Sequence, residues 1–180
     1  MSDAAPAPAA EPVTLDARPE GRYHSDQIVA HWTVVFLVIF QYLTGQGMER
    51  AHEVGLALGA LPASGSIVVH AVIGLSILAA MLWRLGLRLK HGAPPPPDTE
   101  PKPLQWLSRS VHYAFYAILI AMPIAGALAL WLGSATLGWL HGLSAWILLG
   151  LIALHIAGGL WHALKRDGVI RRIARGNVVP

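Results

Sequence analysis

Several histidines of this sequence lie inside stretches that are otherwise almost entirely apolar. The stretch 137–165 reads LGWLHGLSAWILLGLIALHIAGGLWHALK and contains His141, His155 and His162. It exceeds the roughly 20 apolar residues that a membrane-spanning helix needs, and an ionisable side chain within a membrane is costly enough to indicate function. Because a helix turns about 100° and rises about 1.5 Å per residue, His141 and His155 share one face at depths roughly 21 Å apart. This spacing suits two stacked haems, and the alternative is that each imidazole only hydrogen-bonds a neighbour.

The composition indicates a membrane protein without cysteine chemistry. Of the 180 residues, 54% are hydrophobic and only 13% are charged, well below the roughly 25% charged residues of soluble domains. The absence of cysteine excludes disulfides, cysteine-ligated iron–sulfur clusters and covalently attached c-type haem. A haem would therefore be held non-covalently, and nine histidines against four methionines favour histidine ligands. The basic residues lie in connections without a nucleic-acid-binding motif, so we expect no nucleic-acid partner.

Four apolar stretches predict an all-α, four-helix bundle integral to the membrane. The predicted helices are about 27–45, 66–87, 107–132 and 137–165, with connections at 46–65, 91–103 and 133–138. The run of prolines within 91–103 excludes a helix there. We expect a disordered Ala- and Pro-rich tail over residues 1–22, a four-helix transmembrane domain over 23–166 and a basic cytoplasmic tail over 167–180.

The basic residues predict how the helices cross the membrane. Every Lys and Arg except Arg50 lies on one side if both termini share that side with the 84–109 connection. The positive-inside rule then makes both termini cytoplasmic. In this topology His31 matches His155 in the cytoplasmic half of the membrane, and His70 matches His141 in the outer half.

Four histidines that pair by depth across three helices favour axial ligation of two haem irons. Neutral imidazole is a good iron ligand, and two imidazoles leave the iron no open position, which suits electron transfer. His162 is the alternative to His155, but it would separate the two ligands of its helix by about 31 Å. So wide a separation disfavours electron transfer. His112, near the cytoplasmic boundary, could meet a haem propionate or a quinone, or make an interfacial hydrogen bond.

The order and spacing of several segments resemble the prokaryotic cytochrome b561 family of di-haem, four-helix membrane cytochromes. The matching segments, within about residues 22–173, are Ala30-His31-Trp32, HAVIG at 70–74, RLGLRLK at 84–90, AMPIAG at 121–126 and the gap from His141 to His155. The resemblance implies two b haems ligated at His31, His70, His141 and His155, with pairs His31/His155 and His70/His141. It also implies electron exchange with quinone in a bacterial inner (plasma) membrane that the chain crosses several times.

Three functions remain open at this stage. Some members of the family look like oxidases of superoxide that deliver electrons to ubiquinone, and others are similar to cytochrome b subunits that anchor hydrogenases or dehydrogenases. We expect a membrane oxidoreductase that passes electrons between a donor at the outer face and the quinone pool. The alternatives are a haem b anchor subunit with a redox partner protein, and a haem-free bundle that uses its histidines for metal or protons. The chain departs from the family in its longer N-terminal tail and its short third connection, which leaves little outer surface for a substrate pocket.

Overall fold

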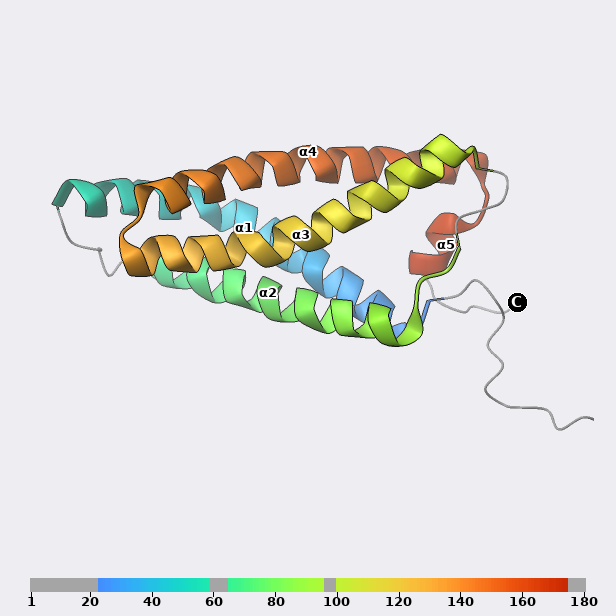
Figure 1. The fold of residues 1–180 in the computed structure, drawn as a ribbon, viewed down its shortest axis with the longest axis horizontal. Helices are drawn as coiled ribbons and strands as arrows, with labels where there is room; N and C mark the ends of the chain where they lie inside the picture. Colours follow the sequence, from blue (N-terminus) through green and yellow to red (C-terminus); the bar gives the residue numbers. More distant parts are fainter. Residues whose placement is uncertain (1–22, 59–64, 96–99, 175–180) are drawn as a thin grey trace, which may run out of the picture.

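The computed structural model describes residues 23–58, 65–95 and 100–174, so the predicted disordered tail at 1–22 lies outside the described residues. Within these ranges the chain is all-α, as predicted. The elements are α1 (Ser25–Leu58), α2 (Gly65–His91), α3 (Lys102–Leu132), α4 (Ala135–Lys165) and α5 (Val169–Ala174). The four long helices run along the longest axis of the molecule, and α5 lies at the end where α1 begins and α4 ends (Figure 1).

Four helices among the described residues are long and apolar enough to cross a membrane. They are the Ser25–Gly45 part of α1 and the whole of α2, α3 and α4. Large apolar side chains on α1–α4, such as Leu43 and Trp131, point outward and are 75% and 82% exposed. An apolar outer surface of this extent is typical of a face covered by lipid. The predicted bundle of four membrane helices is therefore confirmed in its helix content, while its orientation stays a prediction.

The predicted first connection, residues 46–65, is wrong over most of its length. The first helix continues to Leu58 instead of ending at Gly45. Glycine lowers helix propensity by only about 1 kcal/mol, which the surrounding structure can override. Here the start of α2 supports the extension, because Ser66 Oγ donates to the carbonyl oxygen of Gly47 at 3.2 Å. The other long helices begin and end within a few residues of their predicted positions.

The connection between α3 and α4 is even shorter than its predicted span of 133–138. Gly133 ends α3 in the left-handed conformation, with φ at 59°, which glycine adopts without steric cost. Ser134 then caps α4, since its side-chain oxygen accepts from the amide of Leu137 at 3.4 Å. This two-residue turn makes α3 and α4 an antiparallel hairpin.

The core lies at mid-depth between two helical hairpins. Helix α1 packs along α2, α3 packs along α4, and α2 also contacts α3. The buried core consists of Val34, Val38, Ile73, Ile77, Ala80, Met81, Leu119 and Leu148. On α4, Leu148 is 3% exposed and lies midway between His141 and His155. The two histidine depths are thus separated by a packed apolar layer.

Candidate cofactor-binding site

The structure brings the predicted site residues together in two places at opposite ends of the bundle. His70 and His141 lie toward the α3–α4 turn with ring centroids 5.9 Å apart, and are called the turn-side pair. His31 and His155 lie toward the other end with centroids 6.4 Å apart. His112 joins them, 5.3 Å from His155, and the three are called the terminus-side cluster. The turn-side pair and the His31/His155 pair each join one helical hairpin to the other.

The spacing of the facing rings is the spacing that a shared metal ion requires. Bonds of about 2 Å from one metal ion to an imidazole nitrogen on either side place the two ring centroids roughly 6 Å apart. Both centroid separations, 5.9 and 6.4 Å, agree with this value. Among the described residues no group of three or more His, Cys, Asp or Glu could hold a bare metal ion. A pair of facing imidazoles without further protein ligands suits an iron whose remaining ligands come from a macrocycle, which supports haem over a protein-only metal site.

A cavity of about 450 Å³ lies beside the turn-side pair. Its lining combines both histidines with small and apolar residues from α2, α3 and α4, namely Ala71, Gly74, Leu75, Pro123, Gly126, Ala127, Ala129, Leu130, Trp131 and Gly138, together with Gln41 and Met48 of α1. Cofactor sites are commonly apolar clefts of this size with a few convergent polar groups. The cavity therefore suits a flat, largely apolar group held by the two imidazoles.

The ring of His141 is held in one orientation by α3. Its Nδ1 lies 2.9 Å from the carbonyl oxygen of Met122, which can only accept, so Nδ1 carries the proton and Nε2 is free to bind a metal. A Cβ at Gly126 would lie 2.8 Å from the Cε1 and Nδ1 atoms of the ring, closer than atoms can approach. Only glycine at this position leaves room for the imidazole.

Helix α1 contacts His70, the second member of the turn-side pair. The Gln41 side-chain amide donates to the carbonyl oxygen of His70 at 3.1 Å. His70 Nδ1 is buried and has no hydrogen-bond partner among the described residues. A buried polar nitrogen without a partner is costly, which fits a side chain whose role is to bind a further group.

The terminus-side cluster is built more densely. The ring of His155 packs between His31, His112 and Phe115, whose centroid lies 5.4 Å from it. His112 Nδ1 donates to the carbonyl oxygen of Ser108 at 2.7 Å, which fixes its tautomer. Among the described residues, a small polar pocket lies beside the cluster.

Positive charge surrounds the terminus-side cluster. The guanidinium of Arg84 interacts electrostatically with His31, His112 and His155, and Arg88 does so with His112. The small polar pocket is lined by Tyr23, Gln27, Arg84, Arg88, Gly92, Ala93, His112, Tyr116 and Ile173. Among the residues whose side chains the structure describes, no lysine or arginine lines the turn-side cavity, so the described surroundings of the two sites differ in charge.

Two features of the terminus side were missed from the sequence. The first is that His112 lies beside His155. The sequence offered one signal for this contact, since His112 is near the cytoplasmic end of the third helix, at a depth similar to that of His31 in the first. His162 faces two carboxylates, with Nδ1 2.6 Å from Asp167 and Nε2 3.3 Å from Glu100. No periodicity could have predicted this contact, because Glu100 belongs to a connection.

The chain matches the family described as prokaryotic cytochrome b561 over residues 22–176. It belongs to the prokaryotic cytochrome b561 family. A protein of Cereibacter sphaeroides named cytochrome b562 is 29% identical over 87% of this chain and 97% of its own length. A protein of Yersinia pestis named probable superoxide oxidase CybB is 29% identical over 74% of this chain and 67% of its own. Membership in this cytochrome b561 family implies haem b, and the facing imidazoles and the apolar cavity fit that group.

Proposed function

We propose that this membrane cytochrome holds two b haems and passes electrons between a donor at the outer face of the bacterial inner membrane and the quinone pool. The observation that carries the proposal is the pair of histidine groups at opposite ends of the bundle, each lying between the two hairpins. When bound, haem supplies an iron that is reversibly reduced by one electron. Two histidines bound to one iron would leave it no open position for oxygen.

The proposed ligands are His70 and His141 on the turn side and His31 and His155 on the terminus side. Centroid separations near 6 Å support both pairs. The choice of His155 over His162 is supported by the bonds of His162, since both of its ring nitrogens are engaged by carboxylates. A nitrogen in such a bond is not available to a metal.

Several neighbouring residues orient the proposed ligands and set their surroundings. The Met122 carbonyl orients His141 and presents its Nε2, while Gly126 makes room for the ring. The core layer around Leu148 excludes water between the two depths, which are roughly 21 Å apart along α4. Arg84 and Arg88 place positive charge at the terminus side, where a haem propionate or the carbonyl of a quinone could be bound.

The haem content of the purified protein tests the proposal directly. We expect two non-covalent b haems per chain, sharp reduced bands of a six-coordinate cytochrome b, and reoxidation of the reduced protein by a water-soluble quinone. A single haem per chain would contradict the assignment of two sites. A protein that purifies without haem but with a bound metal would favour the haem-free function.

The orientation has its own experiment. With both termini cytoplasmic, reporters fused at residue 95 and at the C-terminus should be active only as cytoplasmic fusions. Reporters at residues 55 and 135 should be active only outside. A cytoplasmic signal at residue 135 would reverse the faces assigned to the two haem sites, and the proposed donor and quinone would exchange sides.

The identity of the electron donor distinguishes two candidate functions. The name of the Yersinia relative points to superoxide, a one-electron donor that would be oxidised to dioxygen. Against it, the turn-side connection of α3 and α4 consists of Gly133 and Ser134 alone, and leaves little surface for a substrate site. This favours the alternative, an anchor subunit that receives electrons from a partner dehydrogenase or hydrogenase. Reduction of the isolated protein by a superoxide source supports the first function, and co-purification of a dehydrogenase subunit supports the second.

A further inference from the structure

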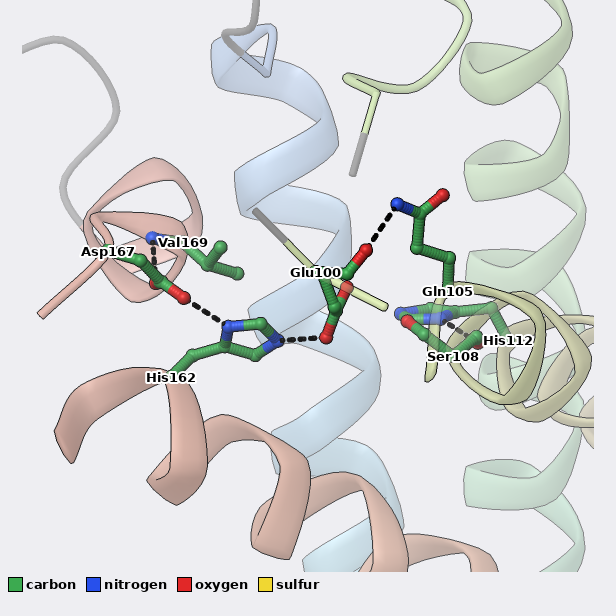
Figure 2. Close-up of polar contacts among 7 residues, drawn as sticks. All are labelled: Glu100, Gln105, Ser108, His112, His162, Asp167 and Val169. Atoms are coloured by element: carbon green, nitrogen blue, oxygen red, sulfur yellow. Dashed lines mark hydrogen bonds and ion pairs between the residues drawn. The ribbon is translucent and has the colours of Figure 1, made fainter. Parts of the chain in front are cut away.

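His162 lies between two carboxylates at the terminus side (Figure 2). Its Nδ1 is 2.6 Å from Asp167 and its Nε2 is 3.3 Å from Glu100. Ionised carboxylates only accept hydrogen bonds, so Nδ1 donates to Asp167, and a ring that is also protonated at Nε2 pairs as a cation with Glu100 as well. The three side chains are largely buried, with exposures of 15% for His162, 7% for Glu100 and 17% for Asp167.

Burial makes each of these groups dependent on the others. A buried carboxylate is costly unless it is paired, and removal of one member of a buried ion pair leaves an uncompensated charge. Burial raises the pKa of Asp167, but hydrogen bonds from His162 and from the amide of Val169, with the charges of His162 and Lys165, outweigh it and hold that pKa below its usual value. Asp167 is therefore stabilised as an anion. The buried carboxylate of Glu100 is stabilised by a positive charge on the neighbouring His162 ring.

Asp167 links this ion pair to the short helix α5. Its second oxygen accepts from the amide of Val169 at 3.2 Å, at the first residue of α5. The chain reverses sharply just before this point, with positive φ angles at Arg166 (54°) and Gly168 (82°). These two residues make the turn by which α5 folds back against the bundle.

Folded back in this way, α5 covers the small polar pocket beside the terminus-side cluster. Ile173 lines that pocket together with Arg84, Arg88 and His112. Two further bonds hold α5 down. Trp32 Nε1 donates to the carbonyl oxygen of Ile173, and Arg172 donates to that of Pro95, each at 3.2 Å.

We propose that α5 is a hinged lid over this pocket, and that His162, hydrogen-bonded to Asp167 and paired with Glu100, is the latch that keeps the lid closed. Release of the latch frees Asp167 and α5 and opens a path from the membrane surface to Arg84, Arg88 and His112. The inference concerns access to the pocket and does not depend on the proposed electron transfer.

The sequence contains no cysteine, so single cysteines report on the lid without background. The probe is a hydrophilic maleimide applied to the purified full-length protein in detergent. Ile173→Cys reports the covered side of α5, Ala174→Cys its exposed side, and Ala80→Cys the 7% exposed core of the bundle. With the latch intact, Ile173→Cys should react at least several-fold more slowly than Ala174→Cys, and Ala80→Cys should not react.

Changes at residue 162 separate the latch from other causes. His162→Phe keeps a planar ring without donors and should raise the labelling rate of Ile173→Cys about tenfold or more, as loss of a charge-assisted hydrogen bond predicts. His162→Lys keeps a cation with donors for both carboxylates and should stay near the parent rate. Arg171→Ala, on the exposed side of α5, removes a charge without touching the latch and should have no effect.

Three results would overturn the lid. They are an Ile173→Cys that already reacts as fast as Ala174→Cys, a His162→Phe that leaves the rate unchanged, and an Arg171→Ala that accelerates labelling as much as His162→Phe. If His162→Phe also exposes Ala80→Cys, the bundle itself has opened, and Asp167→Asn decides instead. If the latch exists, Asp167→Asn accelerates the labelling of Ile173→Cys while Ala80→Cys stays protected. Without that acceleration the latch is rejected.

Discussion

The turn-side pair and the terminus-side cluster place the same kind of side chain in opposite surroundings. The turn side has two histidines beside an apolar cavity of about 450 Å³, and no lysine or arginine with a described side chain lines it. The terminus side has three histidines, the nearby guanidiniums of Arg84 and Arg88, and a small polar pocket that Ile173 of α5 lines. Imidazoles alone therefore do not determine what each site does, because charge and packing around them differ.

The difference in charge has a consequence for electron flow. A positive charge near an iron favours its reduced form and raises its potential, more so at low dielectric. With haem at both sites, we expect the terminus-side centre to have the higher potential, so that electrons pass from the turn side to the terminus side.

Removal of either turn-side ligand should abolish one of the two centres. His70→Ala and His141→Ala should each lose about half of the bound haem and leave the terminus-side haem reducible, because the two side chains face each other at 5.9 Å. Haem-to-protein ratio and reduced spectra of both variants provide the measurement. Loss of spectrally different haems from the two variants would show that they do not share one iron.

The matching experiment at the terminus side compares His155 with His162. His155→Ala should lose the terminus-side haem, since its ring is the one that faces His31. His162→Ala should keep both haems, because that ring is bonded to Glu100 and Asp167. The same haem assay checks both variants. Two intact haems in purified His155→Ala protein would transfer the ligand role to another histidine, His162 or His112.

A smaller, partial loss is expected when the wall of the turn-side site is changed without touching a ligand. Gly126→Ala places a methyl group 2.8 Å from the His141 ring, so the ring must shift. We expect lower occupancy or an altered spectrum of the turn-side haem only. Gly150→Ala, on α4 with nothing within 4 Å of the added group, is the matched control and should behave as the parent. Equal effects of the two variants would remove the structural reason for glycine at position 126.

The charge contrast itself is tested by a redox titration. Arg84→Gln should lower the midpoint potential of the terminus-side haem by on the order of 50 mV, the effect of a unit charge about 10 Å away at an effective dielectric constant of about 20. The turn-side potential should stay constant. The control is Arg109→Gln, which removes an exposed charge of α3 at the same end of the bundle as Arg84. A uniform shift of both potentials would show that Arg84 acts as a general surface charge.

The smallest effect is a response to pH that is confined to the terminus side. Because the folded structure holds the pKa of Asp167 below its usual 3.8, this carboxylate stabilises α5 above that pH, and its contribution is lost as the pH falls through the lowered pKa. Labelling of Ile173→Cys in short acid pulses should therefore accelerate relative to that of the exposed Ala174→Cys below about pH 3.8, while Ala80→Cys stays protected. The comparison is needed because the reactive thiolate becomes scarcer at low pH in every variant. The acceleration should be absent in Asp167→Asn.

Much of the fold could be predicted from the sequence because its signals are local. Apolar runs long enough to cross a membrane predicted the four helices, and the chain's segments identified the family before any contact was known. Counting residues from the helix starts also predicted which histidines share a depth, and the structure places His31 beside His155 and His70 beside His141. Their roles as ligands, the orientation in the membrane and the division into tails and core domain stay predictions.

The tertiary structure decided what depends on neighbours from other helices or on the path of a connection. The sequence predicted that the first helix ends at a glycine, whereas α1 continues to Leu58 and contacts the start of α2 through Gly47 and Ser66. Only the approach of α3 to α4 shows that Gly126 must be small and that His112 joins His155. The partners of His162 come from the connection before α3 and the turn before α5, and the direction of a connection carries no periodic signal. Helix periodicity specifies which face a residue lies on, and packing alone specifies what meets that face.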